Sequence, residues 1–363
     1  MTTTSRRRGV TIADVAKRAG VSTSTASLAF RSTGSITDET RRRILLAASE
    51  LDYAGPNPTA RSLKSGRSGI VGVVVAESIR RAFQSPVTIA TMDGLSEVLD
   101  ELDVGQLLLP GRADSLGRGR PLDTMPVDAV VFVTRGEEFD SLLAGLKARR
   151  IPMVGIEGPH LDGIVLIDID DARGTAEVAH HVRSLGHVDV GVVMRTTRVG
   201  EHVPPGAPEP VARGLEAIGN RTIRERLRAT ASVFPDARRV EAGGRDLEAG
   251  AVAAGRLLDE PVSGRRPTAI LAQNDMLAAG ALRAAAARGL RVPEDLTVTG
   301  FDGADLPWLE QRLTTIEQPL HERGRRAGLA VGELLAGGSP ASVVLPVTLR
   351  VGETSGPVPR GSR

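Results

Sequence analysis

The sequence contains no cysteine, and only 2% of its 363 residues are aromatic. Without thiols, disulfide bonds, thiolate metal sites and cysteine nucleophiles are excluded. No run of about 18 apolar residues is present, so we expect no transmembrane helix. The polar, basic segment from Met1 to Arg8 also lacks the apolar core of a secretion signal. We therefore expect a soluble protein of the cytoplasm that does not contact a membrane.

The signatures of common cofactor and metal sites are missing as well. No Gly-x-Gly-x-x-Gly motif follows the first apolar run, Ile70 to Val75, and the six histidines show neither zincin nor zinc-finger spacing. The aspartates of the segment Asp168 to Asp171 superficially resemble the magnesium cluster of a phosphotransfer enzyme. No phosphate loop or catalytic base accompanies them. We therefore expect no cofactor and no metal, and an enzyme is the less favoured alternative.

The charge of the chain is unevenly distributed, although its net value is only +2. Residues 1–67 carry 12 lysines and arginines against 5 aspartates and glutamates, a net charge of +7. The remaining residues carry 34 and 39, a net charge of −5. The basic N-terminal end is therefore the candidate for binding a polyanion.

The first 55 residues predict three short helices around one small core. The first begins at Thr11, with Asp14 completing a capping box, and ends at Gly20. The second begins at Ser22 after so short an interruption that the two helices must cross. The third begins at Thr37, and the apolar face expected for it consists of Ile44, Leu45, Ala48 and Leu51.

A turn-rich stretch from Asp52 to Pro58 marks a domain boundary. One more short helix, Thr59 to Lys64, can form before Ser65 to Gly69 release the chain, although so short a helix is marginal by itself. We therefore assign residues 1–55 to a helical domain and residues 56–68 to a hinge helix and linker.

From Ile70 onward, short β-branched runs alternate with helical segments rich in alanine and leucine. This alternation predicts parallel sheets covered by helices, and its length suits two Rossmann-like lobes within residues 69–354. We expect lobe 1 at about 69–186 and 316–343, lobe 2 at about 187–315 and 344–354, and a disordered tail or tag scar at 355–363. The predicted strands are Ile70 to Val75, Gln106 to Leu109, Ala129 to Val133, Met153 to Ile156, Val165 to Ile167, Val190 to Met194, Ala269 to Ala272 and Leu296 to Thr299.

The segment from Val10 to Phe30 closely resembles the helix-turn-helix of the lac repressor (LacI/GalR) family, and the resemblance continues without a gap to residue 65. Later landmarks resemble the effector domain of that family. They are Asp170 to Gly174, Leu185 to His187, Ala272 to Asp275, Val292 to Asp295, Gly300 to Asp302 and Leu313 to Pro319. The resemblance implies a multidomain α + α/β fold, with a helix-turn-helix followed by two lobes of periplasmic-binding-protein type.

The same resemblance implies a transcription regulator, and more specifically a repressor. Such a protein binds double-stranded operator DNA as a homodimer or tetramer. In this family the second helix lies in the major groove, where Thr23, Ser24 and Leu28 would meet base edges. Leu28 can offer only an apolar contact, for instance to a thymine methyl. The residues that would grip phosphates are Thr11, Ser22, Ser27, Arg31 and Thr37, although Ser22 and Thr37 are equally well explained as helix caps.

The hinge carries two further candidates for DNA contact. The leucine that matches Leu63 wedges into the minor groove in this family, and Arg61 precedes Leu63 by two positions. The alternative for Leu63 is a lone apolar residue in a linker.

The resemblance also implies a small effector bound between the lobes, at the carboxyl ends of strands. Asn274 and Asp275 follow one predicted strand and Asp302 follows another, although helix capping is an alternative role for the first two. The residues expected to contact the effector are Phe83, Asp170, Arg245, Asn274, Asp275, Asp302 and Trp308.

Three departures from the family pattern concern the identity of the effector. Val211 stands where sugar-sensing relatives carry an arginine, Arg245 stands where they carry an aromatic platform, and the segment from Glu77 to Ala90 lacks the usual Asn-Pro-Phe-Phe run. A sugar usually needs an apolar ring face to lie on, so a standard sugar effector is less favoured than some other metabolite. A dimeric, nucleoid-style DNA binder without any ligand response is the second alternative.

Overall fold

The computed structural model describes residues 10–30, 36–55, 66–75, 78–111, 125–133, 140–196, 218, 220–260 and 265–360. The chain divides into two compact units, Met1–Gly69 and Ile70–Arg363. Three of the residues predicted to contact DNA, Arg31, Arg61 and Leu63, lie outside the described residues, as do the predicted hinge helix and Val211.

The N-terminal unit contains the three predicted helices, α1 (Ile12–Ala19), α2 (Thr23–Leu28) and α3 (Asp38–Glu50). Their shared core is made mostly of small side chains: Val15, Ala16, Ala19, Ala26, Ala29, Ile44, Ala47 and Ala48. Because alanines fill most of this core, the three helices can pack closely. The predicted face of α3 is wrong at Leu45, which is 43% exposed, while Ala47 is buried in its place. Ala47 and Ala48 lie three and four residues after Ile44, on the same side of the helix.

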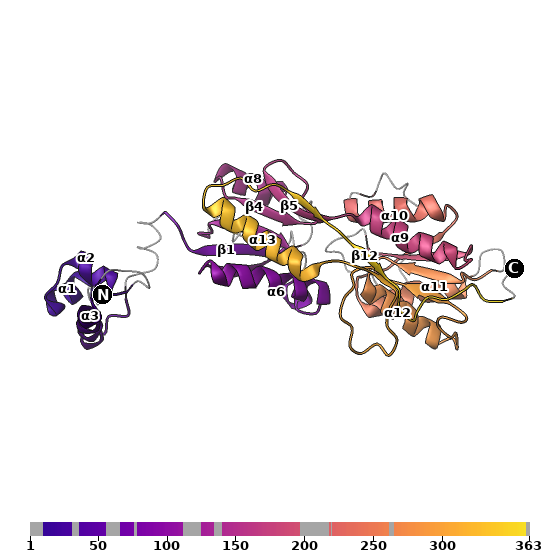
Figure 1. Ribbon diagram of the computed structural model, residues 1–363, viewed down its shortest axis with the longest axis horizontal. Helices are drawn as coiled ribbons and strands as arrows, with labels where there is room; N and C mark the ends of the chain where they lie inside the picture. Colours follow the sequence, from indigo (N-terminus) through magenta and orange to yellow (C-terminus); the bar gives the residue numbers. More distant parts are fainter. Residues whose placement is uncertain are drawn as a thin grey trace, which may run out of the picture. The chain divides into compact units, whose positions relative to one another are not determined.

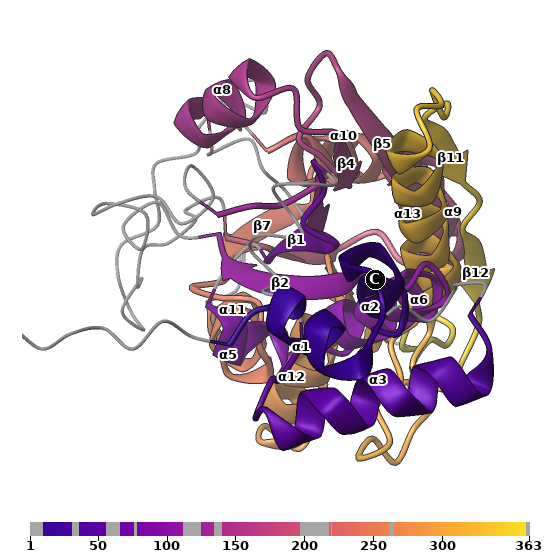
Figure 2. The ribbon, with the colours of Figure 1, turned by 90° about the vertical axis from the view of Figure 1, so that its left-hand side faces the viewer.

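Lobe 1 is built on a six-stranded parallel sheet in the order β11-β5-β4-β3-β1-β2 (Figure 1). Helices α6 (Pro86–Glu101) and α13 (Leu320–Leu335) cover one face, and α8 (Asp140–Ala148) covers the other (Figure 2). The strands are β1 (Ile70–Val75), β2 (Gly105–Pro110), β3 (Ala129–Val133), β4 (Met153–Ile156), β5 (Ile164–Ile169) and β11 (Val343–Leu345).

The crossing of α6 and α13 depends on glycine. A Cβ atom at Gly324 would lie 1.9 Å from the carbonyl oxygen of Thr91, and one at Gly94 would lie 2.0 Å from that of His321. No side chain fits at either distance, so the two helices approach each other backbone to backbone. This close contact ties a late segment of the chain, α13, to α6 near the beginning of lobe 1.

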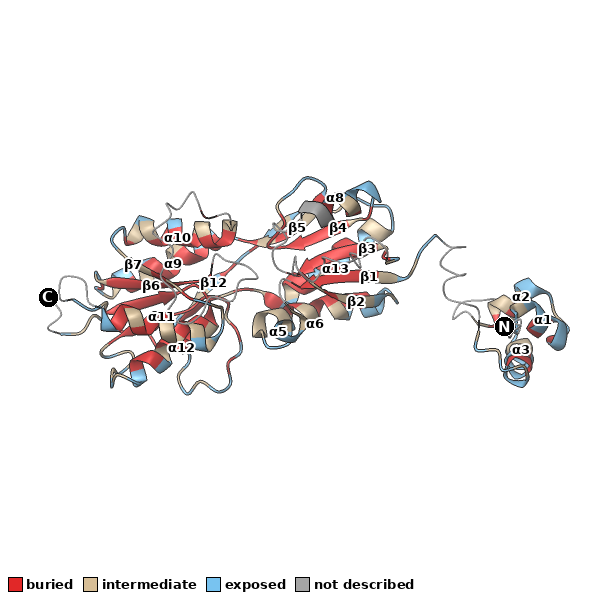
Figure 3. Ribbon diagram, turned by 180° about the vertical axis from the view of Figure 1, so that it is seen from behind, coloured by how far each residue is buried: buried red, intermediate tan, exposed pale blue. Residues whose placement is uncertain are grey.

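Lobe 2 is built on a four-stranded parallel sheet in the order β7-β6-β8-β9. Its strands are β6 (Val190–Met194), β7 (Arg238–Glu241), β8 (Ala269–Ala272) and β9 (Thr297–Thr299). Helices α9 (Asp171–Ser184) and α10 (Arg221–Val233) cover one face, and α11 (Leu247–Asp259) and α12 (Asp275–Ala286) cover the other. The strands of both lobes are mostly buried (Figure 3), as expected for parallel sheets with helices on both faces.

Three segments connect the lobes. The chain passes from β5 into α9, returns from β10 (Thr315–Glu317) into α13, and crosses again from β11 into β12 (Thr348–Arg350). Strands β10 and β12 pair antiparallel, with Ile316 opposite Leu349. This arrangement of two doubly covered sheets joined by crossing strands is the one that the sequence predicts.

The structure shifts two of the predicted lobe boundaries. Residues 171–184 were assigned to lobe 1, but α9 packs into lobe 2, where Ala179 and Val182 lie against Phe234 and Leu271. Residues 344–345 were assigned to lobe 2, but β11 pairs with β5 at the edge of the lobe 1 sheet. In both cases the change of lobe falls at a strand end, which periodicity alone does not mark.

The C-terminal segment also differs from the expected disordered tail. Thr354 accepts a backbone hydrogen bond from Val298 at 2.8 Å, and Val358 donates one to Leu185 at 3.0 Å. The Gly356 carbonyl accepts a hydrogen bond from the ring of His187 at 2.9 Å. Residues 354–358 therefore lie along the β9 edge of lobe 2. Residues 361–363 lie outside the described part of the chain.

Among the described residues, no helix combines the length and the apolar character that crossing a membrane requires.

Candidate DNA-binding surface and ligand cavity

The second helix of the N-terminal unit presents hydroxyl groups at its beginning. Ser22 caps α2, because its Oγ accepts a hydrogen bond from the Thr25 amide at 3.1 Å, and it also lies 2.7 Å from the Ser24 hydroxyl. Ser22, Thr23 and Ser24 are all exposed, whereas Ser27 and Leu28 are half-buried one turn later. The first turn of α2 is therefore an exposed, polar surface, and the base-reading candidates Thr23 and Ser24 lie on it.

The predicted phosphate-binding residues Thr11 and Thr37 also lie at helix starts. The backbone amide and the hydroxyl of Thr11 both donate to the Asp14 carboxylate, at 2.8 and 2.7 Å. Thr37 accepts a hydrogen bond from the Thr40 amide at 3.3 Å. Capping roles are thus present at Ser22 and Thr37, and a further contact to phosphate stays a prediction for all three residues.

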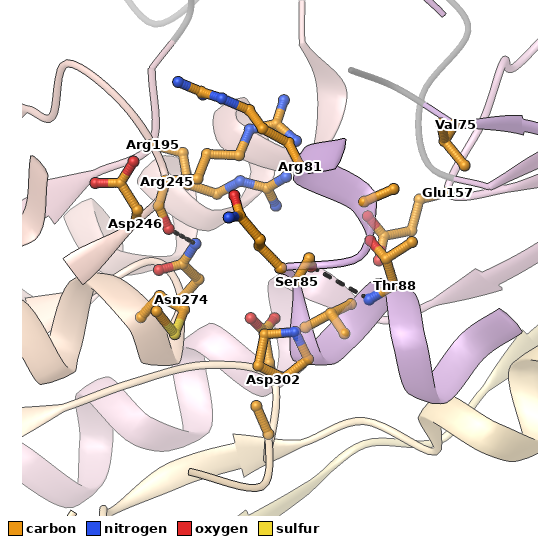
Figure 4. A pocket seen from close by; sticks show the side chains of 16 residues that line it. Val75, Arg81, Ser85, Thr88, Glu157, Arg195, Arg245, Asp246, Asn274 and Asp302 are labelled. Atoms are coloured by element: carbon orange, nitrogen blue, oxygen red, sulfur yellow. Dashed lines mark hydrogen bonds between the residues drawn. The ribbon is translucent and has the colours of Figure 1, made fainter. Parts of the chain in front are cut away.

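A cavity of about 160 Å³ lies between the two lobes (Figure 4). Lobe 1 lines it mainly with the segment that leads into α6, together with Glu157 after β4. Lobe 2 lines it with residues that follow β6, β7, β8 and β9. The lining residues are Val75, Arg81, Ala82, Gln84, Ser85, Pro86, Val87, Thr88 and Glu157 from lobe 1, and Arg195, Arg245, Asp246, Asn274, Met276, Asp302 and Ala304 from lobe 2. The cavity is therefore at the carboxyl ends of parallel strands, where ligands bind in folds of this type.

Two of its residues, Asn274 and Asp302, lie where the sequence places them. Asn274 caps α12, with its Oδ1 accepting from the Leu277 amide at 2.7 Å, and its Nδ2 donates to the Arg245 carbonyl at 3.3 Å (Figure 4). Capping and lining the cavity are thus combined in one side chain. The Asp302 backbone has a φ of 135°, a region that favours glycine, and is held there by hydrogen bonds with Ile316 and Gln318.

Burial changes the ionisation of Asp302. Loss of solvent, followed by the nearby Asp275 carboxylate, raises the pKa of Asp302 from 3.8 to about 8. Its Oδ1 accepts a hydrogen bond from Gln318 Nε2 at 2.7 Å. At neutral pH this carboxyl is therefore mostly protonated, so it can donate a hydrogen bond to a ligand.

A chain of buried polar contacts runs from Asp302 to lobe 1. Gln318 accepts a hydrogen bond from Arg323 on α13 at 2.7 Å, and Arg323 forms an ion pair with Glu157. Arg323 also donates to the Thr91 hydroxyl of α6 at 3.1 Å. Because this chain contains residues of both lobes, a ligand that contacts Glu157 or Asp302 acts on the junction of the lobes.

A second buried pair lies beside the cavity, inside lobe 2. Arg226 Nε donates to Asp171 at 2.7 Å, and the guanidinium carbon lies 3.5 Å from the centre of the Phe301 ring. Burial is the largest influence on Asp171 and raises its pKa to about 6, even though Arg226 acts in the opposite direction. This pair joins α9 to α10.

Four of the predicted effector residues are not brought to the cavity. Asp170 caps α9 through the Arg173 amide at 2.9 Å, and the fully buried Asp275 accepts from the Ala304 amide at 2.7 Å and the Thr315 hydroxyl at 2.5 Å. Phe83 and Trp308 are 64% and 52% exposed and do not line it. Arg245, Asn274 and Asp302 do line it.

Three residues that line the cavity were not predicted from the sequence: Arg81, Glu157 and Arg195. Glu157 and Arg195 directly follow the predicted strands that end at Ile156 and Met194. The strand-end rule that led to Asn274 and Asp302 would also have found them. Arg81 lies in α5 and not directly at the end of the preceding strand β1, so the strand-end rule does not single it out.

The aspartate cluster that resembles a magnesium site has other partners. Asp168 lies 2.8 Å from His160 Nε2, Asp170 caps a helix, and Asp171 pairs with Arg226. Within the described part of the chain, no group of three or more acidic or histidine side chains could hold a metal ion.

Two family models match the sequence. The model described as "Bacterial regulatory proteins, lacI family" matches residues 11–57, and the model described as "Periplasmic binding protein-like domain" matches residues 179–355. Both matches agree with the resemblance noted from the motifs.

Similar proteins include regulators of two bacteria. An HTH-type transcriptional regulator of Mycolicibacterium smegmatis is 33% identical and covers 96% of this chain and 97% of its own length. The HTH-type transcriptional regulator DegA of Bacillus subtilis is 32% identical, and the match covers 96% of this chain and 98% of DegA.

Solved structures show the same fold at lower identity. The lac repressor dimer bound to operator and the anti-inducer ONPF has a TM-score of 0.71 at 22% identity, covering 96% of this chain and all of that one. The complex of the transcriptional regulator CelR with cellobiose has a TM-score of 0.65 at 22% identity, and the match covers 95% of this chain and 99% of CelR.

Proposed function

The chain belongs to the lacI family of bacterial regulatory proteins and is a DNA-binding transcription regulator, and we propose that a small ligand in the cavity between its lobes controls its affinity for an operator. The observation that carries the proposal is the cavity itself. It is lined by both lobes, at the strand ends, and its residues Glu157 and Asp302 belong to the buried chain of contacts that joins the lobes. A ligand that contacts both walls therefore stabilises one arrangement of the lobes over others.

DNA recognition is assigned to the start of α2. Thr23 and Ser24 would read base edges in the major groove, with Leu28 offering an apolar contact. Ser22, Ser27, Thr11 and Thr37, together with Arg31 and Arg61 outside the described residues, would contact phosphates. Leu63, also outside them, would act as the minor-groove wedge. The exposed hydroxyls at the first turn of α2 support this assignment.

Dimerisation is assigned to an apolar groove on lobe 1. Phe83 and Ile89, which are 64% and 49% exposed, line it, and its other apolar residues include Ile79, Met92 and Leu108. A second copy of the chain is the proposed occupant, because a dimer presents two helix-turn-helix units to a near-palindromic site. A solved relative of the same fold is described as a dimer bound to operator.

The groove and the cavity share three lining residues, Val75, Ala82 and Thr88. The segment around α5 (Ile79–Ala82) and the start of α6 thus faces the ligand on one side and the partner subunit on the other. A ligand that shifts this segment would change how the two subunits meet, which gives a physical route from the cavity to the DNA-binding units.

Selection of bound duplexes from a random pool, at moderate and fixed salt, tests the DNA-binding assignment. We expect one near-palindromic sequence to be enriched by the wild type, and Thr23→Ala to relax the preference at one position of each half-site. Ser49→Ala, an exposed serine on α3, is the control and should leave the selected sequence unchanged. Enrichment of no sequence, with or without metabolites, would contradict the proposal.

Sedimentation and DNA titration of a Phe83→Asp variant test the dimer assignment. The new charge should convert the dimer to monomers and weaken operator binding, since each monomer has only one reading unit. Val188→Asp introduces the same charge at a 68% exposed position on lobe 2 and should change neither property. A Phe83→Asp variant that remains dimeric would place the interface elsewhere.

A further inference from the structure

The lobe 2 wall of the cavity contains a buried arginine, Arg195, that is not held by a carboxylate. Its side chain is 7% exposed, and its Nε atom is buried without a hydrogen-bond partner among the described residues. Two other arginines of the described part of the chain are as deeply buried, and each forms an ion pair with a buried carboxylate: Arg226 with Asp171, and Arg323 with Glu157. A buried cation without such a partner is unfavourable, so this one marks a place for an anion that is not part of the chain.

Two more arginines lie close to Arg195. Figure 4 shows Arg81 and Arg245 beside it on one side of the cavity. Burial, followed by the positive charges of Arg245 and Arg226, lowers the pKa of Arg195 to about 10. The positive charge of Arg245 therefore disfavours that of Arg195, and a bound anion would relieve the repulsion between them.

The acids of the cavity do not cancel this positive charge. Glu157 is engaged by Arg323. Asp246, which caps α11 by accepting from the Ala249 amide at 2.9 Å, places one carboxylate against three arginines. Asp302 keeps its proton at neutral pH, as described above. A protonated Asp302 does not repel an anion, and it can donate a hydrogen bond to one.

Helix starts add to the positive potential of the cavity. The 16-residue helix α6 begins after Ser85, which accepts from the Thr88 amide at 3.2 Å, and the 12-residue helix α12 begins after Asn274. Both caps line the cavity. The partial positive charge at these helix starts favours a negative ligand, in the same sense as the arginines.

We infer, on the basis of the proposed function, that the effector is a small metabolite with a phosphate or carboxylate group, which Arg195 and Arg245 bind. An uncharged sugar fits this cavity less well, because none of the described residues that line it is aromatic. Arginine suits either anion, since its planar guanidinium donates two parallel hydrogen bonds to a phosphate or a carboxylate.

Thermal unfolding of the full chain in inorganic phosphate and in acetate, each against chloride at equal ionic strength, tests the inference. We expect one of the two anions to raise the melting midpoint of the unit Ile70–Arg363 (the lobe unit) by about 2 to 4 °C at ten times its dissociation constant. Above that constant, the rise should continue with the logarithm of the anion concentration. The anion that acts identifies the headgroup. No rise above the chloride control with either anion would overturn the inference.

Two variants separate anion binding from a structural role. Arg195→Gln should remove the rise and leave the midpoint of the ligand-free protein unchanged or higher, because it deletes a buried charge that no carboxylate balances. Arg265→Gln, at a 63% exposed arginine of the same lobe, should leave the rise intact. A rise that survives Arg195→Gln, or a large loss of stability in that variant, would contradict the assignment.

Operator binding tells the failure of this inference from that of the proposed function. If neutral metabolites change the affinity for the selected duplex while the anions have no effect, the inference fails and the proposed function stands. If no metabolite of either kind changes that affinity, ligand control itself fails. A change with anionic metabolites only, lost in Arg195→Gln, supports both.

Discussion

The N-terminal unit, Met1–Gly69, which we call the helical unit, and the cavity between the lobes assemble their candidate sites in opposite ways. On α2 the exposed hydroxyls come from consecutive residues, Ser22 to Ser24, placed by one cap and one helical turn. The cavity collects side chains from segments as distant in sequence as Arg81 and Asp302. The first site depends on local structure, and the second depends on how sheets, helices and crossing strands pack. Changes that damage one site should therefore leave the other intact.

The largest difference between the two units is expected from Arg226→Gln. Breaking the buried Arg226–Asp171 pair leaves a carboxylate inside lobe 2 without its cation, at a cost of about 3 to 5 kcal/mol. In calorimetry the unfolding transition of the lobe unit should move to lower temperature, while that of the helical unit should stay at the same temperature. Arg265→Gln should move neither transition. A parallel shift of both would show that the two units do not unfold independently.

The next effect is a pH dependence confined to the lobe unit. Native Asp302 holds its proton up to about pH 8, whereas the unfolded chain releases it near 3.8. The folded state therefore binds more protons in this window, and stability falls as pH rises through it. Burial also raises the pKa of Asp171 and Asp275 to about 6, so Asp302 is the last of the three to ionise.

Asp302→Asn isolates that contribution. Between pH 6.5 and 8, the free energy of unfolding of the wild-type lobe unit should fall by up to about 1.4 kcal/mol per pH unit because of Asp302, and the variant should lose that contribution. The helical unit should show no corresponding change. Equal slopes in the two proteins would mean that Asp302 is already ionised at pH 6.5.

The smallest effect is expected in the helical unit. Ser22→Ala removes the cap on α2 and should cost about 1 kcal/mol of the stability of that unit. Chemical denaturation followed by circular dichroism measures the loss, and Ser22→Asp, which restores a capping side chain, should recover most of it. If Ser22→Asp recovers stability but not DNA affinity, Ser22 contacts phosphate in addition to capping the helix.

The sequence predicted the local features well. The caps at Thr11, Ser22 and Thr37 and most strands of both lobes lie within a residue or two of their predicted positions, because caps and β-branched runs act over a few neighbouring residues. Asn274 and Asp302 were found for the same reason, since each directly follows a strand.

Features that depend on tertiary packing were not predictable. Strand β7 begins with two arginines, Arg238 and Arg239, so it has no apolar run, and β10 to β12 have only three residues each. Helix α9 changes lobe without any change in its periodicity. Phe83 and Asp275 were selected for chemistry that suits a ligand, but an exposed position and a buried hydrogen-bond network keep them away from the cavity.

The most direct test asks whether an anionic ligand acts through Arg195 on DNA binding. It measures the affinity of the wild type and of Arg195→Gln for the selected duplex, with matched neutral and anionic metabolites at constant ionic strength. We predict that an anionic metabolite changes the wild-type affinity by about 5- to 150-fold and leaves that of Arg195→Gln unchanged. Wild-type affinity that no metabolite alters, or an equal change in the variant, would contradict it.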